Sequence, residues 1–384
     1  MANPPTPLPG ARDLFTLDRT TLQLNHGSFG AVPRPVQRAQ QAVRDEVESN
    51  PMRFFSRVAI DRVEAARRTI AEFLGADPDG TALVANATTA AQIVSDSVAL
   101  APGDEVLVTD HGYGAVTMGL ERACARVGAS VVTVPVGFAA TDDEIVEALV
   151  AAVGPRTRLA YVDQITSPTA LLFPVARIVA ALRALGVATL VDGAHVPGAL
   201  AVDVTALGAD FWLGNLHKWA YAPRGTAVLT VAERWRPSIQ PTIVSWEAHR
   251  GFPGAIEWQG TLDYSAWLAA PVGIEVLRDL GWAEVRAHNT ALVEYGQRIV
   301  AAALDAPTPG SSGVPMRPIP LRPGLVDSQD AALALRARIV EEIRAEVALS
   351  FWQGMGILRL SAQVYNTAEE YERLAERLPA LTKR

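Results

Sequence analysis

Short apolar runs alternate with amphipathic segments between about residues 75 and 231 of the chain. The runs are rich in valine and have the length of buried strands, and they lie at 82–85, 105–109, 130–134, 159–163, 188–192, 211–214 and 226–231. Helix-like periodicity fills the segments between them, at 88–100, after residue 113, at 142–153 and at 175–185. This alternation predicts an α/β fold in which a mainly parallel, seven-stranded sheet is covered by helices on both faces.

Two further regions flank the predicted sheet. Residues 34–74 have the pattern of two helices, broken near "ESNPMRFF" because Pro51 disfavours a helical residue before it. Beyond Pro271, helix-like stretches at 271–280, 282–304 and 330–347 flank the strand-like "MRPIPL", "ALSFWQ" and "GILRLS", and a last helix begins at the capping pair Thr367 and Glu370. We therefore expect a large domain at 31–270, a smaller α+β domain at 271–384, and an N-terminal arm at 1–30 that joins the small domain.

Composition narrows the class of protein. The chain of 384 residues has no run of 18 apolar residues, and its start, "MANPPTPLPG", lacks the features of a secretion signal, so we expect a cytoplasmic protein without membrane spans. A single cysteine, Cys124, excludes an intrachain disulfide framework. The net charge of −7 and scattered arginines argue against nucleic acid as a partner.

Polar residues follow several predicted strands, where parallel sheets bind ligands. Ala87 and Thr88 of "NATTAAQ" begin a helix whose N–H groups and dipole suit an anion, although Thr is also an ordinary N-cap. Tyr113 of "DHGYGA" could lie over a flat ligand or pack in a loop. Asp163 and Ser167 of "DQITSPTA" offer polar groups or a turn.

Two charged residues stand out at the next strand ends. Asp192 ends the fifth run, and a buried carboxylate there needs a cationic partner, whereas an N-cap is the structural alternative. Lys218 lies between a histidine and a tryptophan in "GNLHKW", and a buried lysine is costly unless it is paired, deprotonated or covalently used. Pyridoxal 5′-phosphate (PLP) uses a phosphate cradle, a stacking ring, a carboxylate and a lysine together, so the sequence predicts this cofactor.

The same residues lie in motifs that resemble a known family. The chain is similar to the fold-type I, class V aminotransferase group, and within it to the isopenicillin N epimerase-like branch. The resemblance extends from residue 24 to residue 367 and rests on nine segments in order: "LNHGSFGAVPRPV", "NPMRFFSR", "NATTA", "DHGYGA", "TSPTA", "VDGAHVPG", "GADFWLGNLHKW", "WQGTLDYSA" and "LRLSAQVYNT".

The resemblance implies a role for each matching residue. Lys218 would hold the cofactor's aldehyde as a Schiff base and then act as the base at the substrate's α-carbon, while Asp192 would pair with the pyridine nitrogen. The other cofactor-binding residues would be Ala87, Thr88, Tyr113, Ser167, His195, Asn215, His217, Gly260 and Thr261, the last two reaching the phosphate from the second subunit of a homodimer. Substrate would be bound by Asn25, His26, Gly27, Arg53, Phe54, Arg57 and Arg359, with Arg359 taking the α-carboxylate. No metal is expected.

The fold does not fix the reaction. A desulfurase needs a nucleophilic cysteine shortly before the carboxylate-binding arginine, and none lies between Ala306 and Arg359. Epimerisation needs a second base opposite Lys218, which the sequence does not identify, and transamination stays open. β-Elimination from a substrate with a sulfur leaving group needs Lys218 and at most one further residue, a proton donor to the leaving group. Of the four reactions, it therefore requires the fewest catalytic residues.

The chain is also similar to the hercynylcysteine sulfoxide lyases of ergothioneine biosynthesis, which implies a substrate with a trimethylammonium group. Aromatic residues suit such a cation, and Phe54, Phe55, Trp246, Trp258 and Trp352 lie in or near the motif segments, although large aromatics are more often core residues. A non-catalytic binding protein of this fold would be expected to lack Lys218 or Asp192. A dinucleotide-binding oxidoreductase is disfavoured because no G-x-G-x-x-G follows the first strand.

Overall fold

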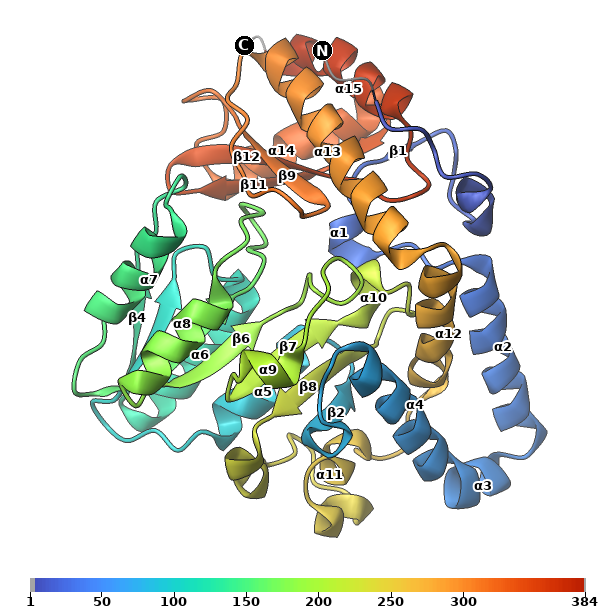
Figure 1. Ribbon diagram of the computed structural model, residues 1–384, viewed down its shortest axis with the longest axis vertical. Helices are drawn as coiled ribbons and strands as arrows, with labels where there is room; N and C mark the ends of the chain where they lie inside the picture. Colours follow the sequence, from blue (N-terminus) through green and yellow to red (C-terminus); the bar gives the residue numbers. More distant parts are fainter. Residues whose placement is uncertain (1–3, 383–384) are drawn as a thin grey trace. The chain divides into compact units, whose positions relative to one another are not determined.

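A computed structural model describes residues 4–382 and divides the chain into two compact units (Figure 1). Unit 2 contains residues 35–166 and 173–276, and unit 1 contains the remaining described residues, including the short segment 167–172. The domain limits expected from the sequence, at 30/31 and 270/271, stay a prediction about independently folding parts.

Unit 2 is built on a sheet of seven strands in the order β2-β8-β7-β6-β5-β3-β4 (Figure 1). β8 is antiparallel to both of its neighbours, so the other six strands point the same way. This confirms the predicted mainly parallel sheet, with ends that differ by two residues at most. The strands are β2 (Thr81–Val84), β3 (Glu105–Thr109), β4 (Ser130–Val134), β5 (Thr157–Asp163), β6 (Ala188–Asp192), β7 (Phe211–Asn215) and β8 (Ala227–Val231).

Helices cover both faces of this sheet. Apolar residues of α5 and α6 pack in one cluster with Tyr161 and Leu190, whereas α8 contacts β5 and β6 from outside that cluster. A capping box formed by Thr141 and Glu144 begins α7. The helices of unit 2 are α2 (Arg34–Ser49), α3 (Pro51–Arg53), α4 (Ala59–Phe73), α5 (Ala87–Ser97), α6 (Gly114–Val127), α7 (Asp142–Ala151), α8 (Val175–Ala184), α9 (Val204–Leu207), α10 (Leu216–Trp219), α11 (Gly254–Glu257) and α12 (Ser265–Asp279), with a π-helical turn at Phe54–Val58 and 3-10 turns at Pro78–Gly80, Glu233–Ser238 and Trp246–Arg250.

Unit 1 is a smaller α+β unit. β9 (Met316–Pro320), β11 (Ala348–Trp352) and β12 (Met355–Ser361) form an antiparallel sheet in the order β11-β12-β9. The N-terminal β1 (Leu22–Gln23) pairs with β10 (Ala345–Glu346), so the N-terminal arm belongs to this unit. The helices are α1 (His26–Phe29), α13 (Trp282–Leu304), α14 (Gln329–Arg338) and α15 (Ala368–Thr382), with a 3-10 turn at Ala11–Leu14 and a π-helical turn at Ile339–Ile343.

Two predicted helix limits in the C-terminal region are wrong. The helix expected at 330–347 stops at Ile343, because Arg344 takes a left-handed conformation with φ of 61° and the next two residues pair with β1. The helix expected to begin at 271 begins at Ser265 instead and carries Pro271 inside it. Tertiary pairing decides the first of these limits, since helix periodicity continues through the segment.

A buried ion pair joins three elements of unit 2. The Arg67 guanidinium on α4 donates to Oε2 of Glu257 on α11 at 2.5 Å, and both side chains are 7% exposed. The backbone N–H of Leu83 on β2 donates to Oε1 of the same carboxylate at 2.9 Å. Burial raises the pKa of Glu257 to about 7, and Arg67 opposes that rise. This carboxylate therefore fixes the start of the segment that leads to Gly260 and Thr261.

We predict that Arg67→Met lowers the free energy of unfolding by about 3–5 kcal/mol at pH 8, because it leaves the Glu257 carboxylate buried without its cation. Glu257 then holds its proton to higher pH in the folded state than in the unfolded state. Since the unfolded state loses that proton first, the penalty grows as pH rises from 6 to 8. Urea denaturation at both pH values measures it.

Arg68→Met is the matched control for this prediction. Arg68 lies on the same helix, is 52% exposed and pairs with the surface carboxylates of Glu64 and Asp79, so its loss should cost much less stability than the loss of Arg67. Equal losses in the two variants would show that the buried pair does not fix this part of unit 2.

Candidate active site

The carboxyl ends of β2, β3, β5, β6 and β7 meet at one edge of the large sheet, because these five strands are parallel. The sheet order changes direction between β3 and β5, and ligands of such sheets bind at this kind of switch point. Apart from Gly260 and Thr261, the predicted cofactor residues of unit 2 follow these strands. They are Ala87 and Thr88 after β2, Tyr113 after β3, Asp192 and His195 at β6, and Asn215, His217 and Lys218 at β7 and α10.

Lys218 lies on the single turn α10, directly after β7. Its Nζ atom is 3.1 Å from Nε2 of His195, which is 2% exposed. The turn is held from behind by the buried Trp219 and by Gly198, where an added Cβ would lie 2.3 Å from the carbonyl oxygen of Trp219. The structure thus brings together the two residues of "VDGAH" and "GNLHKW" that the sequence separates by 23 positions.

Asp192 is buried at the end of β6, with 3% of its surface exposed. Its Oδ2 atom accepts a hydrogen bond of 2.8 Å from the Tyr161 hydroxyl, and its Oδ1 atom accepts one of 2.8 Å from the backbone N–H of Ala194. Burial raises the pKa of Asp192, while these donors and the positive charge of Lys218 lower it. A positive ligand group beside this carboxylate would therefore meet a prepared anion.

Asp163 is a second buried carboxyl group at this edge. It ends β5 directly opposite Asp192 in the sheet register and is 2% exposed. The sequence indicates Asp163 only as a polar residue of a strand end. The register between Asp163 and Asp192 becomes known only from the pairing of β5 with β6 in the structure. Sequence periodicity does not show which strands are neighbours.

The phosphate end of the predicted site begins at α5. The backbone N–H of Ala87 donates to Oδ1 of Asn215 at 2.9 Å, and Asn86 caps the helix by accepting from the N–H of Thr89. Thr88 is exposed at the first turn. Asn86, and not Thr88, is therefore the N-cap residue of α5. Thr88 lies at the surface, where an anion could reach it.

His217 lies beside Lys218 as a neutral imidazole. Burial, with the charge of Lys218, lowers its pKa to about 4. Its Nδ1 atom is 3.1 Å from the carbonyl oxygen of Thr226 and so carries the proton that it donates there. The remaining ring nitrogen is then an acceptor, which would receive a hydrogen bond from a protonated phosphate oxygen or from water.

The loop after β3 presents one aromatic ring outward. Tyr113 is 43% exposed, whereas His111 is fully buried and contacts the carbonyl oxygen of Val136 through Nε2 at 2.9 Å. Of the two rings, only Tyr113 has a free face for a flat ligand.

Arg359 and its partners lie within unit 1. The Arg359 guanidinium donates to the backbone oxygen of Ser167, to the Ser167 hydroxyl at 3.4 Å, to Oδ1 of Asn25 at 3.2 Å and to the Ser28 hydroxyl at 3.3 Å. Ser167, expected among the cofactor residues, is thus placed with the expected carboxylate-binding arginine. Arg359 is 5% exposed, and two separate segments, around residues 25–28 and at Ser167, orient its guanidinium.

His26 and Gly27 stabilise the loop that carries Asn25. Nδ1 of His26 is 3.0 Å from the Tyr365 hydroxyl, its Nε2 is 3.3 Å from the amide nitrogen of Gln363, and the ring is 3% exposed. The backbone N–H of Gly27 donates to the Ser361 hydroxyl at 3.3 Å. Both residues act on the shape of the loop, and their expected contact with substrate stays a prediction.

The segment "NPMRFFSR" forms α3 and the π-helical turn. Arg53 and Arg57 are exposed, whereas Phe54 is 2% exposed and lies under the Arg62 guanidinium at 5.9 Å. Phe54 is thus a core residue here.

Gly260 has φ of 114°, a conformation that favours glycine. Gly260 and Thr261 follow the segment that the Arg67–Glu257 pair fixes.

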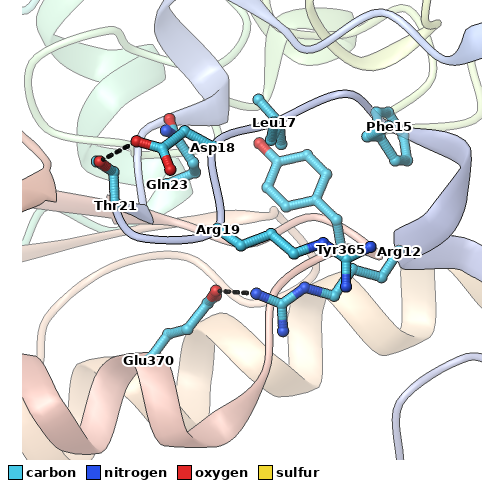
Figure 2. A pocket seen from close by; sticks show the side chains of 9 residues that line it. All are labelled: Arg12, Phe15, Leu17, Asp18, Arg19, Thr21, Gln23, Tyr365 and Glu370. Atoms are coloured by element: carbon cyan, nitrogen blue, oxygen red, sulfur yellow. Dashed lines mark hydrogen bonds and ion pairs between the residues drawn. The ribbon is translucent and has the colours of Figure 1, made fainter.

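A small hollow in unit 1 is too small for a cofactor. Its volume is about 20 Å³, enough for a water molecule. Figure 2 shows its wall, where Arg12 reaches Glu370 at 3.2 Å and joins the N-terminal arm to α15. Among residues 4–382, no helix is long and apolar enough to cross a membrane, and no group of side chains has the composition of a metal site.

Comparison with known proteins identifies the family. The model of the aminotransferase class-V family matches residues 31–374. The chain belongs to this family. As a member of it, the protein is an enzyme that depends on PLP, which confirms the predicted cofactor.

Individual relatives match over nearly the full chain. Isopenicillin N epimerase of Streptomyces clavuligerus is 35% identical and covers 97% of this chain and 98% of its own. Putative L-cysteine desulfhydrase 2 of Oryza sativa subsp. japonica is 32% identical and covers 95% and 85%.

Solved structures share the fold. A mutant of C-DES with glycine covalently linked to its PLP cofactor has a TM-score of 0.84 and 23% identity, and covers 96% of this chain and 98% of its own. The cystine C–S lyase C-DES in complex with its reaction product cysteine persulfide has a TM-score of 0.82 and 22% identity, and covers 94% and 98%. These likenesses confirm the predicted fold-type I architecture.

The edge of the sheet in unit 2 fits PLP by its own chemistry. The buried oxygens Asp163 Oδ2, Thr109 Oγ1 and Thr226 Oγ1 have no hydrogen-bond partner within residues 4–382, so the polar groups of unit 2 are not fully satisfied by the chain alone. The same edge offers an amine at Lys218, a carboxylate at Asp192 and an exposed ring at Tyr113. These are the groups that an aldehyde, a pyridine nitrogen and an aromatic face require.

We predict that Gly198→Ala displaces the turn that carries Lys218. The new Cβ would lie 2.3 Å from the Trp219 carbonyl oxygen, at a residue whose φ is 87°. Gly186→Ala is the control, because φ there is 75° but nothing lies within 4 Å. We expect Gly198→Ala to be at least about 2 kcal/mol less stable than the control and to retain less PLP after dialysis. Equal stability and PLP content would contradict this account of the turn.

Proposed function

We propose that this enzyme is a carbon–sulfur lyase that performs β-elimination on a cysteine-sulfoxide-type amino acid. The observation that carries the proposal is the Lys218–His195–Asp192 arrangement, which supplies a base and a carboxylate in unit 2 without any thiol. Cys124, the one cysteine of the chain, is 1% exposed within α6, and burial raises its pKa. A nucleophilic cysteine of the desulfurase kind is therefore not supported.

Lysine usage supports the role of Lys218. The chain has 34 basic residues of the Lys and Arg type, and only Lys218 and Lys383 are lysines. Arginine is always charged, whereas a buried lysine can lose its proton and form covalent bonds. A lysine kept inside the strand-end turn of such an arginine-rich chain supports a chemical task.

PLP, when bound, supplies a protonated pyridine ring that withdraws electrons from the α-carbon of the substrate. Asp192 keeps the proton on the pyridine nitrogen, because it accepts two other hydrogen bonds and stays anionic. Lys218 takes the proton from the α-carbon, with His195 at 3.1 Å holding the amine in place. Tyr113 covers the ring face, and Ala87, Thr88, Asn215 and His217 bind the phosphate.

Arg359 binds the α-carboxylate of the substrate as a bidentate ion pair in this proposal. Its contacts with Asn25, Ser28 and Ser167 orient the guanidinium within unit 1. Loss of the α-proton leads to cleavage of the Cβ–S bond. The sulfur fragment leaves as a sulfenic acid, and the three-carbon fragment reacts with water to give pyruvate and ammonia.

Hercynylcysteine sulfoxide is the proposed substrate. Its sulfenic acid product gives ergothioneine after a thiol reductant supplies two electrons. Phe55 is half-buried and Trp246 is 90% exposed, so both could meet a trimethylammonium group, whereas the buried Phe54 could not. Arg53 and Arg57 are exposed and could bind a second carboxylate. The desulfhydrase relative supports cleavage of a carbon–sulfur bond.

Amino-acid epimerisation is the second candidate, because the isopenicillin N epimerase relative has 35% identity over nearly the full chain. It requires a base on the ring face opposite Lys218. In both cases we propose a homodimer, in which Gly260 and Thr261 reach the phosphate of the other subunit, and a cytoplasmic location.

We predict that the purified enzyme releases pyruvate from hercynylcysteine sulfoxide in the presence of a thiol reductant. Pyruvate is measured with lactate dehydrogenase, and the sulfur product is identified by mass spectrometry. A racemised α-carbon without pyruvate would instead establish the epimerase.

We predict that borohydride reduction attaches PLP to Lys218 and not to Lys383, as measured by peptide mass mapping. Lys218→Ala should abolish both the attachment and the elimination, since Lys218 is both the proposed attachment point and the proposed base at the α-carbon. Lys383→Ala is the matched control and should keep both. Full activity of Lys218→Ala would overturn the mechanism.

A further inference from the structure

The feature with no role so far is the second carboxyl group beside Asp192. Asp163 and Asp192 end adjacent parallel strands in direct register, so both side chains point to the same face of the sheet. Neighbouring strands are about 5 Å apart, which places the two carboxyl groups within reach of each other. They are 2% and 3% exposed. Two carboxyl groups this close and this buried do not both ionise.

The contacts of the two groups differ. Asp192 accepts from the Tyr161 hydroxyl at 2.8 Å and from the N–H of Ala194 at 2.8 Å, and the charge of Lys218 stabilises its negative form. The largest effects on the pKa of Asp163 come instead from burial, from the charge of Asp192 and from hydrogen bonds. Its Oδ2 atom is buried and has no hydrogen-bond partner in the described part of the chain. A proton on this oxygen would displace no existing hydrogen bond.

The direction of the pKa shift agrees with this difference. Burial and the negative charge of Asp192 raise the pKa of Asp163 well above its ordinary value, although the Tyr161 hydroxyl and the backbone N–H of Tyr113 oppose the rise. Burial likewise raises the pKa of the Tyr161 hydroxyl, so Tyr161 stays a neutral donor. The charge at this edge is therefore concentrated on a single group.

We infer that Asp163 is a positioning residue that carries the one proton of the Asp163–Asp192 pair and, with Tyr161, holds Asp192 as the single anion presented to the cofactor's pyridine nitrogen. The inference rests on the proposed role of Asp192. A negative charge on Asp163 would compete with Asp192 for the charge of Lys218 and for the pyridine proton. A protonated Asp163 instead fills the space beside Asp192 with a neutral polar group. Asp163 touches the chemistry only through Asp192.

The test uses isosteric amides at the two positions. Apoenzyme is reconstituted with PLP, and the apparent Kd is read from the cofactor absorbance, which needs no substrate. Asp163→Asn keeps a neutral polar group and should bind PLP within about threefold of the wild type, whereas Asp192→Asn removes the charge and should weaken binding at least about tenfold. Asp163→Leu should weaken binding to an intermediate degree, because it keeps the volume but removes the polar group.

The outcomes separate the inference from the proposed function. Unchanged PLP affinity in Asp192→Asn would overturn the proposed role of Asp192. Equal losses in Asp163→Asn and Asp192→Asn would overturn the assignment of the proton and leave that role standing. Wild-type affinity in Asp163→Leu would overturn the positioning role.

Infrared spectroscopy gives a direct reading of the proton that does not depend on binding. At pH 7.5 the holoenzyme should show a carbonyl stretch of a protonated carboxylic acid that disappears in Asp163→Asn and persists in Asp192→Asn. A band lost in Asp192→Asn alone, or a wild type without the band, would overturn the inference even if Asp163→Leu fails to fold.

Discussion

The proposed active site depends on how the strand ends of the large sheet hold two buried acids, Asp163 and Asp192, at the edge that also carries the half-buried amine of Lys218. Desolvation disfavours every charge there, so each charged group must be stabilised by a particular donor or by an opposite charge. Asp192 has the Tyr161 hydroxyl, the Ala194 amide and the charge of Lys218. The order of strands β7, β6 and β5 places these groups at one edge of the sheet.

Close packing maintains the geometry around Lys218. The turn that carries it approaches the backbone at Gly198 so closely that a side chain does not fit, and Trp219 is buried behind it. Elsewhere in the same unit, the Glu257 carboxylate joins α4, β2 and α11 through Arg67 and Leu83. The lysine that is proposed to hold PLP therefore lies on a turn that has little freedom to move.

The two units contain different groups of the proposed site. The groups that match PLP are in unit 2, at the carboxyl ends of parallel strands. Unit 1 contains Arg359, whose guanidinium is oriented by Asn25, Ser28 and Ser167 from distant parts of the chain. A family that keeps the cofactor groups constant and varies the residues around the substrate can host several reactions on one fold, which is why family membership gives the cofactor but not the leaving group.

The sequence by itself determined the class of fold, the strands of the large sheet and the cofactor, because buried parallel strands are continuous apolar runs and the residues after them are the ones that meet a ligand. It also determined Lys218 and Asp192 as candidates from their unusual surroundings. Only the tertiary structure decided that Asp163 lies opposite Asp192, that Ser167 belongs with Arg359, that Phe54 is buried, and that the helix before β10 ends at Ile343. These facts depend on which segments become neighbours in space, and local periodicity carries no record of that.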